Sequence, residues 1–146
     1  MVRKENPFLS LKQEQKIVEA IQAAEKNTSG EIRVHIEFES STDHFQTALE
    51  VFNKLGMHQT KERNAVLFHV APYDRNFTII GDEGIDQVTP DDFWEEIKNV
   101  VVSHFKDGKH TKGLCVGIEM AGEALKKYFP YQEDDQNEIS DEISYS

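Results

Sequence analysis

Acidic side chains that could bind a cation stand at two separate places in the sequence. Glu31 opens a run of β-prone residues, and Asp82, Glu83 and Asp86 lie together in the segment GDEGID around Gly84. Carboxylates that face one another repel and raise one another's pKa values, unless a cation or an arginine neutralises them. Sites rich in oxygen favour Ca²⁺, Mg²⁺ or Mn²⁺ over zinc. These residues therefore predict a divalent-cation site, provided that the fold brings the two places together.

The same acids also have ordinary structural explanations. Glu31 could form a salt bridge with Arg63 or Arg33, and Asp82 could accept backbone hydrogen bonds in a turn. Asp107, in the segment KDGK, is of a type that is common in turns as well as in cation sites. The acidic loop is not an EF-hand, because it lacks the alternating acids and the terminal glutamate of that motif. Both interpretations stay open at this point.

Hydrophobic periodicity divides the chain into helices and strands that would position these acids. The expected helices are residues 10–26, 42–56, 89–105 and 114–129, and the expected strands are 31–38, 64–71 and 76–82. Ser10 and Gln13 fit a capping box, and Thr89 is the expected N-cap of the third helix. In the first strand His35 and Glu37 fall on the more polar, half-exposed face. The order of elements predicts an α/β sandwich with a small mixed sheet covered on both faces.

The predicted topology brings the acids together at one edge of the sheet. The first two strands are joined by a helix, which favours a parallel pair, and the short connection to the third strand favours an antiparallel hairpin. The loops 28–31, 60–64 and 81–87 should then meet at the same edge. Glu31, Arg63 and the acids of residues 82–86 would become neighbours there.

Composition limits the classes of partner and of chemistry. The chain has 146 residues, enough for one domain with a core of its own, and we expect this domain to span residues 1–129. A net charge of −11 argues against nucleic acid and anionic membranes as partners. No signal peptide or transmembrane segment is visible, so we expect no membrane insertion and a cytoplasmic location. The acidic tail, residues 130–146, is expected to be a mostly disordered, solvated charge run.

Histidine and cysteine add little to this picture of the chemistry. The histidines show no pairing at metal-ligand spacing, and His69 and His104 are expected to be hydrogen-bonded core residues. The single cysteine, Cys115, sits in an apolar stretch and is expected to act as a small hydrophobic residue. Phosphate-binding glycine loops and serine nucleophile elbows are missing. Any hydrolysis would have to depend on metal-activated water and carboxylates.

The sequence resembles the TPM domain family, named after a thylakoid lumen protein, a photosystem II repair protein and an acetylcholine-receptor modulator. The resemblance rests on ordered segments that cover most of the chain from residue 23: TSGEIRVHIE, FNKLGMHQTKERNAVLFHVAPYDRNFTIIGDEGI, DDFWEEI, FKDGKHTKGL and FPYQEDDQNEIS. It implies a three-layer α/β/α sandwich around a four-stranded mixed sheet, and so a short fourth strand. It also implies a divalent-cation site that carries over to Glu31, Arg63 with Asn64, Asp82 and Asp107.

Three functions are compatible with these residues. The first is a non-catalytic regulatory or interaction module that binds Ca²⁺ or Mg²⁺ through Glu31, Asp82, Glu83, Asp86 and Asp107. More than one ion could bind, and the ions would order acidic loops that contact an unknown protein partner. The second is a metal-dependent acid phosphatase, an activity associated with the plant branch of the family. The third is an interaction domain without an ion, in which the acids are salt-bridged or cap helices.

Overall fold

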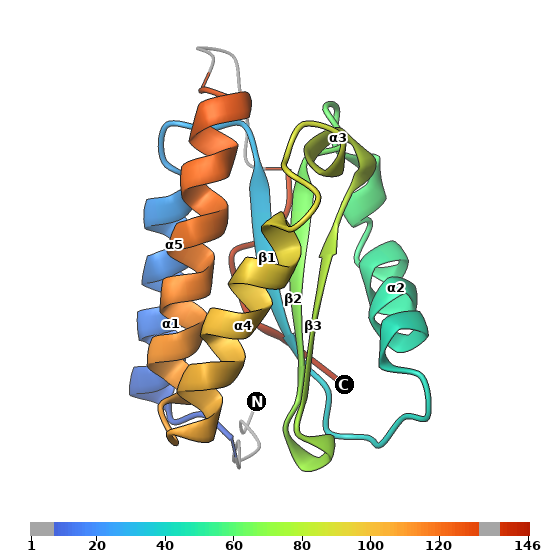
Figure 1. Ribbon diagram of the computed structural model, residues 1–146, viewed down its shortest axis with the longest axis vertical. Coiled ribbons are helices and arrows are strands. Elements are labelled where there is room, and N and C mark those ends of the chain that lie inside the picture. The colour runs from blue at the N-terminus through green and yellow to red at the C-terminus, as the bar shows by residue number, and fades with distance from the viewer. Residues whose placement is uncertain (1–7, 132–137) are drawn as a thin grey trace, which may run out of the picture.

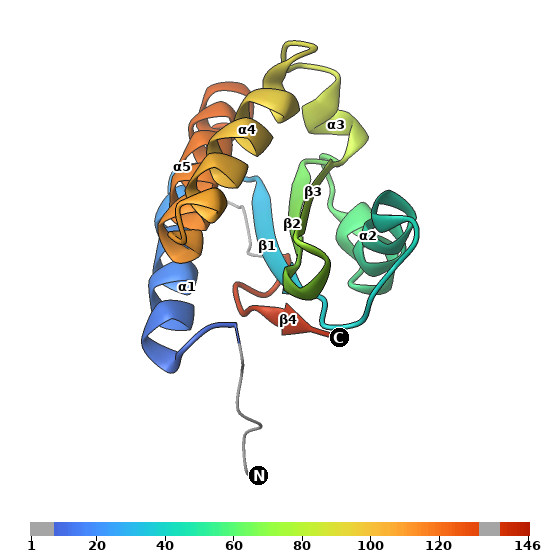
Figure 2. The same cartoon turned by 60° about the horizontal axis from the view of Figure 1, so that its bottom comes forward.

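The computed structural model describes residues 8–131 and 138–146, which form a layered α/β fold. A mixed sheet lies between helices on both faces, which confirms the predicted α/β/α sandwich (Figures 1 and 2). The sheet has four strands in the order β3-β2-β1-β4, so the short fourth strand is also confirmed. Their bounds are β1 Glu31–Ile36, β2 Ala65–Ala71, β3 Asn76–Gly81 and β4 Ser144–Tyr145.

The helices divide unequally between the two faces of the sheet. Helices α1, α4 and α5 pack beside one another on one face, and α2 covers the other (Figure 2). Their bounds are α1 Leu11–Glu25, α2 His44–Lys54, α4 Phe93–Lys106 and α5 His110–Tyr128. The connections contain the short turns η1 Met57–Gln59, η2 Pro72–Asp74 and α3 Glu83–Asp86. Within the described residues no helix is long and apolar enough to cross a membrane.

Successive side chains of the central strands point to opposite faces of the sheet and so contribute to two separate hydrophobic cores. Ile32 and Ile36 of β1 and Phe68 of β2 are buried against α1, α4 and α5. Leu67 points to the other face and packs with Phe52 of α2. Every residue of β2 is buried, as expected for a central strand that is covered on both sides. Polar side chains of β1 that face α2 are therefore buried as well and need partners there.

Helix ends follow the sequence signals in part. The capping box of α1 is present, because the Ser10 hydroxyl accepts from the Gln13 N–H at 3.1 Å and the Gln13 side chain accepts from the Ser10 N–H at 2.9 Å. The prediction that Thr89 caps the next long helix is wrong. Its hydroxyl donates to the carbonyl of Ile85 at 3.0 Å, since the unpredicted turn α3 leaves C-terminal carbonyls without helical partners. Helix α5 also begins earlier than expected, at His110.

The end of the chain is part of the fold, which differs from the expected disordered tail. Ser144 and Tyr145 pair in parallel with His35 and Ile36, and Ile139 is buried beneath α2. The physical reason is the open edge of β1, whose backbone groups need a partner strand. Residues 132–137, which also belong to the expected tail, lie outside the described residues.

Candidate functional site

The three loops that were predicted to meet at one edge of the sheet do meet there. Glu31 is the register partner of Ala65 in the parallel pair β1–β2. The N–H of Asp82 donates to the carbonyl of the same Ala65 at 2.9 Å. The Ser29 hydroxyl donates to the Glu62 carboxylate at 2.7 Å and joins the first loop to the second. The topology inferred from the sequence is therefore correct.

Arg63 is the ion-pair partner of Asp82. Its Nε donates to Asp82 Oδ2 at 2.7 Å and its Nη2 to Asp82 Oδ1 at 2.9 Å. The N–H of Glu83 also donates to Asp82 Oδ1, at 2.8 Å, so Asp82 caps α3. Arg63 Nη1 lies 3.3 Å from the exposed carboxylate of Glu83. Both Asp82 oxygens are thus engaged by protein donors, as in the structural alternative.

The other two predicted acids have separate surroundings. Asp86 Oδ1 accepts from the indole N–H of Trp94 at 2.8 Å. Asp107 is the C-cap that follows α4, and Gly108 after it has φ 73°, so Asp107 belongs to a turn. Helix α4 runs from the α3 end of the sheet towards the opposite end (Figure 1). The structure therefore does not bring Asp107 together with Glu31 and Asp82.

Glu31 has two acidic neighbours that the sequence analysis missed, Glu25 and Asp141. The three acids line one pocket of about 360 Å³ beside Ser29 and Gly30. Glu25 is the last residue of α1, and its Oε2 accepts from the Ile32 N–H at 2.8 Å. The short turn between Glu25 and Glu31 could have indicated from the sequence that these two acids lie close together. The sequence gives no such indication for Asp141, because its distance from Glu31 depends on how the C-terminal segment packs against the domain.

Burial makes this acidic cluster, Glu25, Glu31 and Asp141, hard to ionise fully. Glu31 is only 2% exposed. Its Oε1 accepts from the Glu138 N–H at 2.6 Å, but its buried Oε2 receives no N–H or hydroxyl donor from the described residues. Burial raises the pKa of Glu31 to about 7, and burial together with a hydrogen bond to Asp141 raises the pKa of Glu25 far above its usual range. Protons therefore stay in the cluster at a pH where separate carboxylates would be charged.

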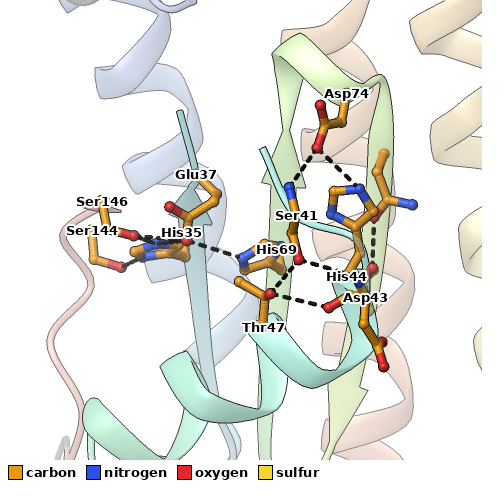
Figure 3. Close-up of polar contacts among 12 residues, drawn as sticks. His35, Glu37, Ser41, Asp43, His44, Thr47, His69, Asp74, Ser144 and Ser146 are labelled. Carbon is orange, nitrogen blue, oxygen red and sulfur yellow. Dashed lines mark hydrogen bonds and ion pairs between the residues drawn. The ribbon is translucent and has the colours of Figure 1, made fainter. Parts of the chain in front are cut away.

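A second polar cluster, the histidine–glutamate cluster, lies on the α2 side of the sheet (Figure 3). His35 of β1 and His69 of β2 are register partners, and their stacked rings have centroids 5.4 Å apart. Glu37 Oε1 lies 3.5 Å from His35 Nε2 and 3.7 Å from His69 Nε2. Within residues 8–131 and 138–146, these three side chains form a buried group of potential metal ligands whose atoms all lie within 4.8 Å of one another.

This cluster corrects the sequence-based view of the histidines. His69 is buried as expected, but neither ring nitrogen has a hydrogen-bond partner in the part of the chain that the structure describes. His35 and Glu37 were placed on a half-exposed face, yet both are buried beneath α2 and the C-terminal segment. Burial lowers the pKa of His35 to about 4 and also lowers the pKa of His69. Both rings are thus neutral near pH 7 and can act as ligands.

A mixed sheet between helical layers, with acidic loops at one edge, defines a small α/β domain with candidate cation sites. The chain belongs to the TPM domain family, whose sequence profile matches residues 2–124. The earlier resemblance is thereby confirmed.

Solved structures agree with this assignment. The chain is similar to the BA42 protein of the psychrophilic bacterium Bizionia argentinensis, with 49% identity, a TM-score of 0.90, and coverage of 98% of this chain and 99% of that one. Two more distant structures share the fold. The N-terminal domain of a P. gingivalis protein has 18% identity and a TM-score of 0.71, covering 87% of this chain and 84% of that one. The N-terminal domain of cg2496 from Corynebacterium glutamicum has 15% identity and a TM-score of 0.63, covering 80% and 74%. A comparison with curated proteins gives no match.

Proposed function

We propose that this TPM domain is a non-catalytic module that binds Ca²⁺ or Mg²⁺ at the acidic cluster. One observation carries the proposal. The buried carboxylate of Glu31 shares a pocket with two further acids, its Oε2 receives no N–H or alcohol hydroxyl from the described residues, and the side chain that hydrogen-bonds to Glu31 is another carboxyl group, that of Glu25. A cation in this pocket would replace the protons that burial and mutual repulsion now retain.

The donor atoms favour a hard cation. The acidic cluster offers carboxylate oxygens from three separate segments that line the same pocket. Oxygen ligands of this kind suit Ca²⁺ and Mg²⁺, whereas zinc prefers nitrogen and sulfur. An overall charge of −11 adds a favourable field for any cation.

The position of Asp141 suggests what the ion would do. Glu25 ends α1 and Glu31 begins β1, whereas Asp141 belongs to the C-terminal segment that continues into β4. An ion shared by all three would fasten residues 138–146 to the body of the domain. The ordered segment would then present a defined surface to a protein partner, as expected for a regulatory or interaction module.

The acids around α3 are the competing location. Asp82, Glu83 and Asp86 would bind an ion only if Asp82 exchanged its contacts with Arg63 for metal bonds. The two locations make opposite predictions for two substitutions, Glu31→Gln and Asp82→Asn. Each keeps the size of the original side chain and one accepting oxygen, although Asp82→Asn also gives up one of the two hydrogen bonds from Arg63.

Amide spectra of the chelator-stripped full chain, titrated with Ca²⁺ and then Mg²⁺, test the proposal. We expect saturable shifts at residues 30–32 and 138–142 that are lost in Glu31→Gln and kept in Asp82→Asn. Loss in Asp82→Asn alone would place the ion at α3, and flat spectra for the wild type would remove cation binding altogether. Turnover of a chromogenic phosphate ester by the calcium-loaded wild type, but not by Glu31→Gln, would favour a phosphomonoesterase over a non-catalytic module.

A further inference from the structure

We propose that His35, Glu37 and His69 form a second and chemically distinct metal site, which binds Zn²⁺. The site lies on the α2 face of the sheet. His35 belongs to β1, Glu37 directly follows β1, and His69 belongs to β2. Two imidazoles and one carboxylate are a zinc ligand set that leaves a fourth position open. The proposal is independent of the acidic cluster, which holds only oxygen ligands.

The distances fit a tetrahedral ion after a small contraction. Zinc bonds of about 2.0–2.2 Å to nitrogen and oxygen place tetrahedral ligand atoms roughly 3.3–3.6 Å from one another. Glu37 Oε1 already lies 3.5 Å from His35 Nε2 and 3.7 Å from His69 Nε2. No ligand atom of the three is more than 4.8 Å from another. A rotation of the two rings towards Glu37 would close the remaining gap.

His69 gives the second, independent observation. Its side chain is 0% exposed on the central strand, and both ring nitrogens lack a hydrogen-bond partner within the described residues. A buried polar group without a partner costs free energy, and such groups are uncommon in folded proteins. One ring nitrogen points towards Glu37 (Figure 3). A metal bond would supply the partner that this nitrogen lacks.

Charge favours the same conclusion. Glu37 is a buried carboxylate, 6% exposed, and in the described part of the chain the basic side chains within 4 Å of it are the two histidines, whose rings are neutral near pH 7. Burying a negative charge beside neutral rings is unfavourable unless a cation compensates. A divalent ion between Glu37 and the rings would provide that compensation.

The C-terminal segment orients the first histidine. Ser144 Oγ lies 2.7 Å from His35 Nδ1 and fixes the ring, as outer hydrogen bonds do for metal-bound histidines. Ser146 Oγ lies 2.6 Å from His35 Nε2 and 2.8 Å from Glu37 Oε1. This hydroxyl bridges two proposed ligand atoms at distances shorter than a tetrahedral site requires, so zinc would displace it and leave the fourth position to water.

Zinc titration of the metal-stripped full chain tests the proposal, with isothermal calorimetry and nitrogen NMR of the histidine rings as readouts. We expect one ion per chain, bound with Mg²⁺ in excess, and ring shifts at His35 and His69. His69→Gln and Glu37→Gln should each weaken binding by more than about tenfold, since even outer-shell partners contribute that much. The controls Glu31→Gln, in the acidic cluster, and His104→Gln, on α4, should keep zinc affinity.

The outcomes separate the two sites. Zinc that binds His69→Gln as tightly as the wild type, or produces ring shifts at histidines other than His35 and His69, would overturn the proposal, as would absence of saturable binding. If amide spectra show that His69→Gln does not fold, His35→Gln replaces it, and the ring shifts of the wild type still decide. Zinc binding that stays intact in Glu31→Gln leaves this proposal standing whether or not the wild type binds Ca²⁺, so the failure of one proposal is distinguishable from the failure of the other.

Discussion

The carboxylate of Glu31 accepts a hydrogen bond from the backbone N–H of Glu138 at 2.6 Å, across 107 residues of sequence. Glu31 opens the inner strand β1, and Glu138 begins the described part of the C-terminal segment. The contact fastens this segment beside the acidic cluster, where Asp141 faces Glu25 and Glu31. Stability, cation binding and the position of the C-terminal segment should therefore change together.

The first prediction concerns pH and Glu31. Because its folded pKa is raised from 4.5 to about 7, ionisation opposes folding, and this penalty grows as pH rises from 4.5 and is complete above 7. Glu31→Gln removes the ionisation and keeps the acceptor for Glu138. We expect the stability advantage of the variant over the wild type to increase by about 1–3 kcal/mol from pH 5 to pH 8, measured in chelator. Urea unfolding of both proteins at the two pH values gives their free energies of unfolding. If variant and wild type differ by the same free energy at pH 5 and at pH 8, the prediction is contradicted.

The second prediction concerns the histidine–glutamate cluster. Burial lowers the pKa of His35 to about 4 and lowers that of His69, so the unfolded chain binds more protons below pH 6.5. Their contribution to stability is present above pH 6.5 and is lost as pH falls towards 4. His69→Leu removes one of these groups and also a buried ring without hydrogen bonds. We expect it to be at least as stable as wild type at pH 7.

At pH 5 the stability advantage of His69→Leu over the wild type should be larger than at pH 7, because the unfolded wild-type chain takes up a proton at His69 that burial disfavours in the folded chain. Urea unfolding at pH 7 and pH 5 in chelator gives both values. A wild type and variant with the same dependence on pH would show that His69 is protonated equally in the folded and unfolded chain. If His69→Leu stabilises the protein and abolishes zinc binding, His69 serves the function of the protein at the expense of its stability.

The third prediction concerns the C-terminal segment. Ile139 is 8% exposed and packs beneath α2 with Leu67 and Ile80. Ile139→Ala should therefore destabilise the protein by about 2–4 kcal/mol, in the range of large-to-small substitutions in a core. The control Leu11→Ala, at a side chain 67% exposed, should cost much less. A disordered tail would instead predict no effect of Ile139→Ala on the urea midpoint.

The fourth prediction concerns the approach of α3 to the loop before β2. A Cβ on Gly84 would lie 2.1 Å from the Glu62 carbonyl oxygen and 2.6 Å from that of Arg63. Gly84→Ala should push the two loops apart and destabilise the protein by about 1–3 kcal/mol, as overpacking does. Gly108→Asn is the control, because Gly108 has φ 73°, which asparagine tolerates, and open space around it. Equal urea midpoints for Gly84→Ala and wild type would contradict the close approach.

The sequence by itself determined the elements and their general arrangement. Periods of 2 and 3.6 residues in the apolar positions located the long helices and the first strands. The connection lengths then gave the parallel pair β1–β2, the hairpin β2–β3 and the meeting of three loops near Glu31. These features are local or follow from general rules of chain connection, so the order of residues alone determines them.

The partners of individual polar side chains were decided only by the tertiary structure. Strand register places His35 opposite His69, and the docked C-terminal segment brings Asp141 to Glu31. The sequence pattern did not indicate that Arg63 would form its ion pair with Asp82. It also did not indicate that the direction of α4 would place Asp107 away from the other acids. Such pairings join residues far apart in the chain, and they are selected by packing and by the need of each buried polar group for a partner.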